Sequence, residues 1–113
     1  MTVGRQWYYI LKGRDVVPAT REEWADFYPG PERIVAQTMI GTVRVSTVFL
    51  GIDHSFTLEG PPIVFETMIF ADDDWADIDQ WRYATYDEAE QGHKVACSIA
   101  EQIVAEATAG ISS

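Results

Sequence analysis

The stretch "RIVAQTMIGTVRVSTVFL", residues 33–50, decides the fold of this chain. Two runs rich in β-branched and apolar residues flank the pair Gly41–Thr42. A Gly-X pair between two such runs is typical of a two-residue type II′ turn, so we expect a β-hairpin here. This turn places Ala36 opposite Thr47 in the two paired strands.

The run "IVFETMIF", residues 63–70, predicts a third strand after a loop that is rich in Gly and Pro. If this strand runs antiparallel and starts with Ile63 opposite Leu50, then Thr47 lies opposite Glu66 and shares its face of the sheet. Both faces would be mostly apolar, and two helices are too few to cover them. We therefore expect a second copy of the chain to cover part of the sheet, as in a two-fold homodimer.

Local signals predict the remaining elements. Thr20 with Glu23, and Thr85 with Glu88, each form a capping-box pattern at the start of a helix. The expected elements are a strand over 6–11, a short helix over 21–27, strands over 33–40, 43–50 and 63–70, an acidic loop over 71–80, a strand over 81–85 and a long helix over about 86–108.

This order, βαβββ(β)α, predicts one α+β domain over residues 1–113. Its core would be an antiparallel sheet of about four or five strands, with one short helix and one long C-terminal helix. Residues 109–113 are expected to be a frayed tail.

The charge of the chain limits its partners. The 113 residues include 18 acidic and 8 basic side chains, for a formal net charge of −10. Direct binding to nucleic acid requires a basic surface, so we expect none. No apolar run reaches the length of a membrane span and no signal segment is visible, so we expect a cytoplasmic protein without membrane contact. The single cysteine, Cys97, excludes an intrachain disulfide and a Cys-rich zinc site.

Four side chains are candidates for acid–base catalysis. Asp53 and His54 are adjacent at the end of a strand, Glu66 lies in mid-strand, and His93 lies on the core-facing stripe of the long helix. Each has a structural alternative as a hydrogen-bonded polar residue. The sequence contains no HExxH, CxxC, phosphate-loop or GxSxG motif. It therefore favours a protein without enzymatic activity, metal or cofactor, and leaves a small hydrolase as an open alternative.

A polar row, Gln37–Ser46–Thr67, would cross three strands on one face of the predicted sheet. One interpretation is a ladder of cross-strand hydrogen bonds. The other is the floor of a binding site for a small nucleotide-type ligand, with Arg44 and Arg82 as phosphate contacts.

The acidic segment "DDDWADID", residues 72–79, lacks the spacing of an EF-hand calcium loop. A solvated loop is one interpretation. The other is a contact for a partner protein, because an exposed Trp often anchors an interface. The candidate partner-binding residues are Asp72, Asp73, Asp74, Trp75 and Asp77.

Four segments, "YYIL", "VSTVFLGIDHSF", "GPPIVFETMIF" and "YATYDEAEQGH", follow one another over about residues 7–95. Together they resemble a family of small bacteriophage and prophage proteins. The resemblance implies a phage-encoded accessory protein in the host cytoplasm; it implies no catalytic residues, because the family has no established activity. We expect a protein that binds and inhibits a host protein, such as a defence component. The alternatives are a module that sequesters a small ligand and a small hydrolase.

Overall fold

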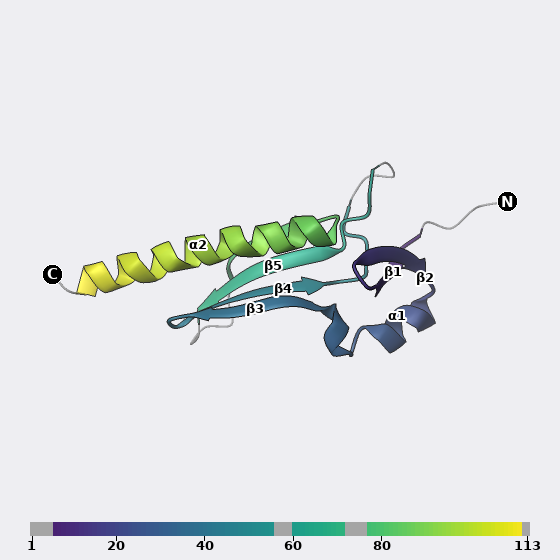
Figure 1. Cartoon of the computed structure of the whole chain (residues 1–113), viewed down its shortest axis with the longest axis horizontal. Helices are drawn as coiled ribbons and strands as arrows, with labels where there is room; N and C mark the ends of the chain where they lie inside the picture. Colours follow the sequence, from purple (N-terminus) through teal and green to yellow (C-terminus); the bar gives the residue numbers. More distant parts are fainter. Residues whose placement is uncertain (1–5, 56–59, 72–76, 112–113) are drawn as a thin grey trace.

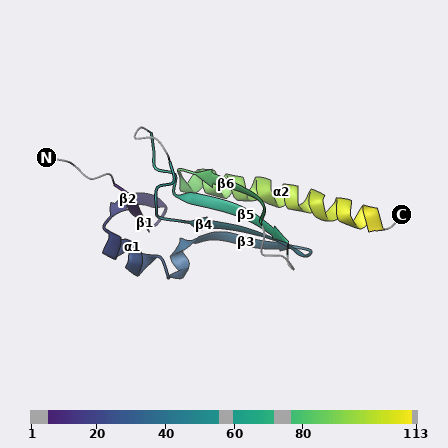
Figure 2. The same ribbon diagram turned by 180° about the vertical axis from the view of Figure 1, so that it is seen from behind.

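The computed structural model describes residues 6–55, 60–71 and 77–111. It confirms an α+β fold, with a four-stranded and a two-stranded antiparallel sheet and two α-helices. The long helix lies along one face of the larger sheet, and the smaller sheet and the short helix lie together near one end of it (Figures 1 and 2). The elements are β1 Tyr8–Lys12, β2 Asp15–Ala19, α1 Arg21–Phe27, a 3₁₀ turn Pro31–Arg33, β3 Ile34–Ile40, β4 Val43–Phe49, β5 Phe65–Ala71, β6 Asp77–Tyr83 and α2 Tyr86–Ile111.

The predicted hairpin of β3 and β4 is confirmed, together with its register. Gly41 has a φ of 59°, which is the positive value that the first central residue of a type II′ turn requires. Ala36 lies opposite Thr47, as expected. A β-bulge between Ile34 and Ala36 interrupts the ladder at the start of β3. The regular part of this edge strand therefore begins at Ala36.

The predicted register of β4 against β5 is wrong by one residue. Thr47 lies opposite Thr67, and the N–H of Leu50 donates to the carbonyl of Val64 over 2.6 Å. Because side chains alternate along a strand, a shift of one residue exchanges the two faces of β5. Glu66 therefore lies on the face away from α2, and Thr67 lies beneath the helix.

Over the described residues there are six strands in two sheets, where the sequence predicts about four or five in one. The sequence does not predict β2, because Pro18 lacks an N–H and argues against a strand. A two-stranded sheet consists only of edge strands, in which proline is tolerated. Similarly, β6 begins at Asp77, within the segment predicted as an acidic loop. Acidic residues do not exclude an edge strand, in which charged side chains are common.

Both predicted capping boxes are present. In the first, Thr20 Oγ1 accepts from the N–H of Glu23 over 3.1 Å, and the Glu23 carboxylate accepts from the N–H of Thr20 over 2.9 Å. Thr85 and Glu88 form the same pair of bonds, over 3.1 and 3.0 Å. The helix that starts there, α2, continues to Ile111, beyond the expected end near residue 108.

Small side chains let α2 lie close to the larger sheet. Ala89, Ala96 and Ala100 are buried against it together with His93, which confirms the predicted core-facing stripe. Gly92 lies against the ring of Tyr83, and any side chain at position 92 would overlap that ring. In the described part of the chain, no helix has the length and hydrophobicity needed to cross a membrane.

The core lies between α2 and the larger sheet, in two parts. Near the smaller sheet, Phe49 and Phe65 pack with ring centroids 5.2 Å apart. Towards the β3–β4 turn, Val45 and Ile69 pack against Ala100. The core is therefore built on one face of the larger sheet, and no described helix covers the other face (Figures 1 and 2).

Candidate functional site

A buried histidine joins three strands beneath α2. His93 is 7% exposed; its ring Nε2 lies 2.9 Å from Thr38 Oγ1 and its Nδ1 lies 2.7 Å from Thr47 Oγ1. Thr47 Oγ1 lies in turn 2.6 Å from Thr67 Oγ1. This chain of hydrogen bonds connects α2 to β3, β4 and β5, and we call it the His93 network.

Most of the His93 network is buried, and only Thr38, at its β3 end, is partly exposed. Thr47 and Thr67 are fully buried, and within the described residues every buried side-chain nitrogen and oxygen has a hydrogen-bond partner. A neutral imidazole has one donor and one acceptor nitrogen, and each threonine hydroxyl can take either role. Burial lowers the pKa of His93, which favours this neutral ring. The network therefore links α2 to β3, β4 and β5 through hydrogen bonds.

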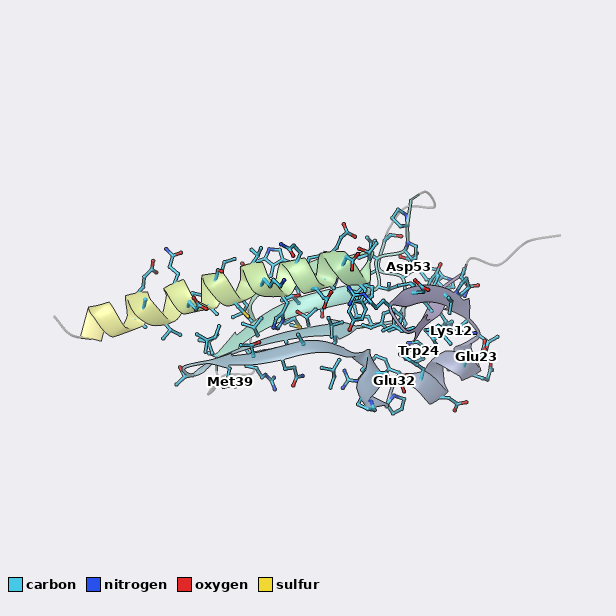
Figure 3. The ribbon with its side chains drawn as sticks, viewed as in Figure 1. Lys12, Glu23, Trp24, Glu32, Met39 and Asp53 are labelled. Atoms are coloured by element: carbon cyan, nitrogen blue, oxygen red, sulfur yellow. The ribbon has the colours of Figure 1, made fainter. Side chains whose placement is uncertain are left out.

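Asp53 forms hydrogen bonds with both ends of the loop that follows β4. Its Oδ1 accepts from the backbone N–H groups of Ser55 and Ile63, each over 2.9 Å, and its own N–H donates to the carbonyl of Trp7 over 3.0 Å. The N–H of His54 donates to the carbonyl of Ile63 over 2.8 Å. Asp53 lies beside the smaller sheet (Figure 3), and these backbone contacts give it a structural role.

The four predicted acid–base residues do not converge. Glu66 Oε2 accepts from Arg82 Nε over 2.9 Å on the face away from α2, so the sheet separates Glu66 from His93. Asp53 and His54 lie at a third place, in the loop. Over residues 6–55, 60–71 and 77–111, no three His, Cys, Asp or Glu side chains lie close enough together to hold a metal ion.

We call the face of the larger sheet that points away from α2 the outer face. Gln37 Nε2 donates to Ser46 Oγ over 3.3 Å on this face, and the Arg44 guanidinium lies 4.8 Å from the centre of the Phe70 ring. The side chains of the outer face include Ile34, Gln37, Met39, Arg44, Ser46, Val48, Glu66, Met68, Phe70, Gln80 and Arg82.

Four of the five predicted ligand-binding residues lie on the outer face, and Thr67 does not. The predicted row Gln37–Ser46–Thr67 is therefore wrong: Met68 takes the third position, opposite Ser46. The error follows directly from the one-residue shift in the β4–β5 register. A polar floor of three strands does not form, although the bond between Gln37 and Ser46 does.

The structure also contains a groove of about 670 Å³ between the β1–β2 hairpin and the start of α2, which the sequence does not predict. Its walls include the rings of Tyr9 and Tyr86 and several prolines. Arg14 stacks over the Tyr86 ring at 4.3 Å from its centre, and its guanidinium pairs with Asp87 and Glu90. Only the tertiary packing of distant segments creates this groove, so no local pattern signals it.

Most of the predicted partner-binding segment, Asp72–Trp75, lies outside the described residues. Asp77 is the first residue of β6, at the edge of the larger sheet.

No family model, curated protein or solved structure matches this chain. The resemblance to phage proteins therefore stays a prediction from the sequence.

Proposed function

We propose that this chain is a non-enzymatic binding protein that occupies a surface of a host protein and thereby inhibits it. Its contact surface is the outer face. The observation that carries this proposal is the open face of the larger sheet, which α2 leaves uncovered while it packs on the opposite face, where Val45, Phe49 and Ile69 are fully buried. A sheet with one open face that mixes apolar and polar side chains is suited to contact with a protein.

The chemistry of the outer face supports a protein partner. Met68 and Phe70 are partly buried in the middle of the sheet, and Met39 is 55% exposed near its edge. The Arg44 guanidinium lies over the Phe70 ring, and this contact restricts it before binding. Methionine, aromatic residues and arginine are enriched at the centres of protein interfaces, which is the composition seen here.

Charge and resemblance support the choice of target. The chain carries a net charge of −10, whereas Arg44, Arg82 and Glu66 leave the outer face close to neutral. The acidic remainder of the surface would speed the approach of a basic target, and the neutral outer face would make the contact. The resemblance to small phage proteins supports a host protein, such as a defence component, as that target.

Met68→Asp is expected to weaken the capture of the host target at least tenfold, because the change places a charge at the centre of the outer face. The measurement is affinity capture from bacterial lysate with the purified chain as bait, followed by a titration of the captured protein. The matched control is Val95→Asp, because Val95 is 57% exposed on α2, away from the outer face. Equal capture by both variants, or capture that salt does not weaken, would contradict the proposal.

The groove supports a second candidate function, the sequestration of a small aromatic ligand. Two tyrosine rings can stack on a planar group, whereas the carboxylates of Asp15 and Asp87 at the groove oppose a phosphate. A nucleoside or a cationic ring therefore fits the groove better than a nucleotide.

A nucleoside panel in thermal-shift measurements tests this second function. The melting temperature is expected to rise with a fitting ligand, and the rise should disappear in Arg14→Ala, which removes the guanidinium stacked on Tyr86. The matched control is Arg44→Ala, because Arg44 stacks on Phe70 outside the groove. A shift that requires Arg44 and not Arg14 would place the ligand on the outer face instead.

A further inference from the structure

The larger sheet has two edges of very different character. Strand β6, "DIDQWRY", carries three charged residues at one edge. Strand β3, "IVAQTMI", forms the other edge and contains no charged residue and no proline. Edge strands that must stay unpaired usually carry charges, proline or bulges that block pairing. Only a bulge at the start of β3 is present, so most of this edge is open to another strand.

Strand β3 also exposes apolar side chains. Ile34 is 38% exposed and Met39 is 55% exposed, and they are two of the four large apolar side chains that are exposed in the described residues. Met39 projects from β3 on the side away from α2 (Figure 3). A seven-residue, uncharged and partly apolar edge is the kind of surface that adds a strand from another chain.

The backbone of β3 presents a defined set of unpaired groups. Ile40 and Val43 flank the two-residue turn, so they form a hydrogen-bonded pair, and such pairs alternate along the ladder. The N–H and C=O groups of Thr38 and Ile40 therefore point to β4. Those of Gln37 and Met39 point to the open edge, where a new strand can bind them.

We propose that β3 pairs antiparallel with β3 of a second copy of this chain, which joins the two larger sheets into one of eight strands. The two-fold axis passes between Thr38 and the partner's Thr38. This register places Gln37 opposite the partner's Met39 and forms about four backbone hydrogen bonds between outward-pointing groups. It uses the regular segment from Ala36 onward and leaves the bulge outside the pairing.

Three observations favour a second copy over a foreign strand. The segment is self-complementary when two copies run antiparallel. Ala36 then lies opposite the partner's Ile40 and Gln37 lies opposite the partner's Met39, and the two-fold axis repeats each pair. The absence of charge in β3 lets two acidic chains meet there without like charges in direct contact. The outer face of one four-stranded sheet spans roughly 450 Å², below the about 800 Å² per partner of a stable interface, and pairing doubles it.

Of these three observations, the size of the outer face rests on the proposed function, whereas the uncharged edge and its self-complementary pairing do not. The pairing of the two β3 strands differs from the dimer expected from the sequence, in which a second copy lies over the face of the sheet. The two arrangements respond differently to substitution, because one depends on backbone groups at the edge and the other on side chains in the middle of the face.

Sedimentation velocity over micromolar to hundred-micromolar concentrations tests the pairing. The wild-type chain is expected to sediment as a dimer, with twice the 12.7 kDa mass of one copy. The fraction of dimer should increase at high salt, because salt screens the repulsion between two acidic chains. Met39→Pro should give monomers, because proline lacks the N–H that points to the open edge, where the fold tolerates it. Met68→Asp, in the middle of the outer face, should leave the dimer intact.

A wild-type chain that stays monomeric throughout would overturn the proposal, as would a dimer that Met68→Asp breaks and Met39→Pro does not. Two measurements do not rely on proline. The amide hydrogens of Gln37 and Met39 should exchange more slowly in the dimer than in the monomer. A short thiol-reactive cross-linker should join the two copies of a Gln37→Cys/Met39→Cys chain on a Cys97→Ser background, because opposite Cβ atoms lie about 5 Å apart. Unchanged amide exchange together with no cross-linked dimer would also refute the register.

Discussion

Gly51→Ala is expected to lower the free energy of unfolding by about 3 kcal/mol or more, through strain and overlap together. Gly51 has a φ of 73°, which an alanine adopts at a cost of roughly 1–2 kcal/mol. A Cβ atom there would lie 2.5 Å from Trp24 Nε1 and 2.8 Å from the carbonyl oxygen of Tyr9. The overlap would displace the indole, whose Nε1 donates to the carbonyl of Leu50 over 3.0 Å.

Gly13→Ala is the matched control for Gly51→Ala. Gly13 has a φ of 64° in the β1–β2 turn, and an added Cβ would meet no atom within 4 Å. This variant therefore carries the conformational strain without the overlap, and we expect a loss of only about 1 kcal/mol. Urea unfolding of both variants measures the difference. Equal losses would show that the contact with Trp24 contributes nothing.

Gly51 matters because it joins the two sheets. The N–H of Tyr9 donates to the carbonyl of Gly51 over 2.7 Å, and Tyr8 forms an isolated bridge with Ile52. The segment after β4 is therefore a docking site for β1 and α1. Asp53 and His54 follow this segment, so they lie where the two sheets meet. The sequence alone leaves a catalytic role for them as an alternative.

Local signals were sufficient for the parts of the fold that depend on neighbouring residues. The Gly41–Thr42 turn determined the β3–β4 register, because a two-residue turn leaves one pairing. The capping boxes at Thr20 and Thr85 located the starts of both helices. Each of these features involves residues that lie close together in the sequence.

The candidate site depended on pairings that no short segment determines. The long loop between β4 and β5 allows several registers, and a shift of one residue moved Glu66 away from His93 and brought Thr67 towards it. The partners of His93 come from three strands, so they follow only from the register and from the docking of α2 together. A core-facing histidine was predictable, whereas its threonine partners were not.

His93→Ala is expected to lower the free energy of unfolding by about 3 kcal/mol, because it opens a cavity and removes hydrogen bonds from buried hydroxyls. Thr47 and Thr67 would keep their mutual bond, but Thr38 and Thr47 would each lose the ring nitrogen that they contact. Thermal and urea unfolding would measure the loss. A change below about 1 kcal/mol would show that the His93 network does not hold α2 to the sheet.

The His93 network also makes the stability depend on pH. Burial lowers the pKa of His93 in the folded chain, whereas a histidine in the unfolded chain takes up a proton near about pH 6.5. Between the lowered pKa and that value the unfolded state binds more protons, so the free energy of unfolding rises with pH and falls as the pH drops below about 6.5. Urea unfolding at intervals from about pH 7.5 to 5.5 should show this fall in the wild-type chain and in His54→Gln, and little of it in His93→Gln. The same slope in all three would mean that protonation of His93 is not its cause.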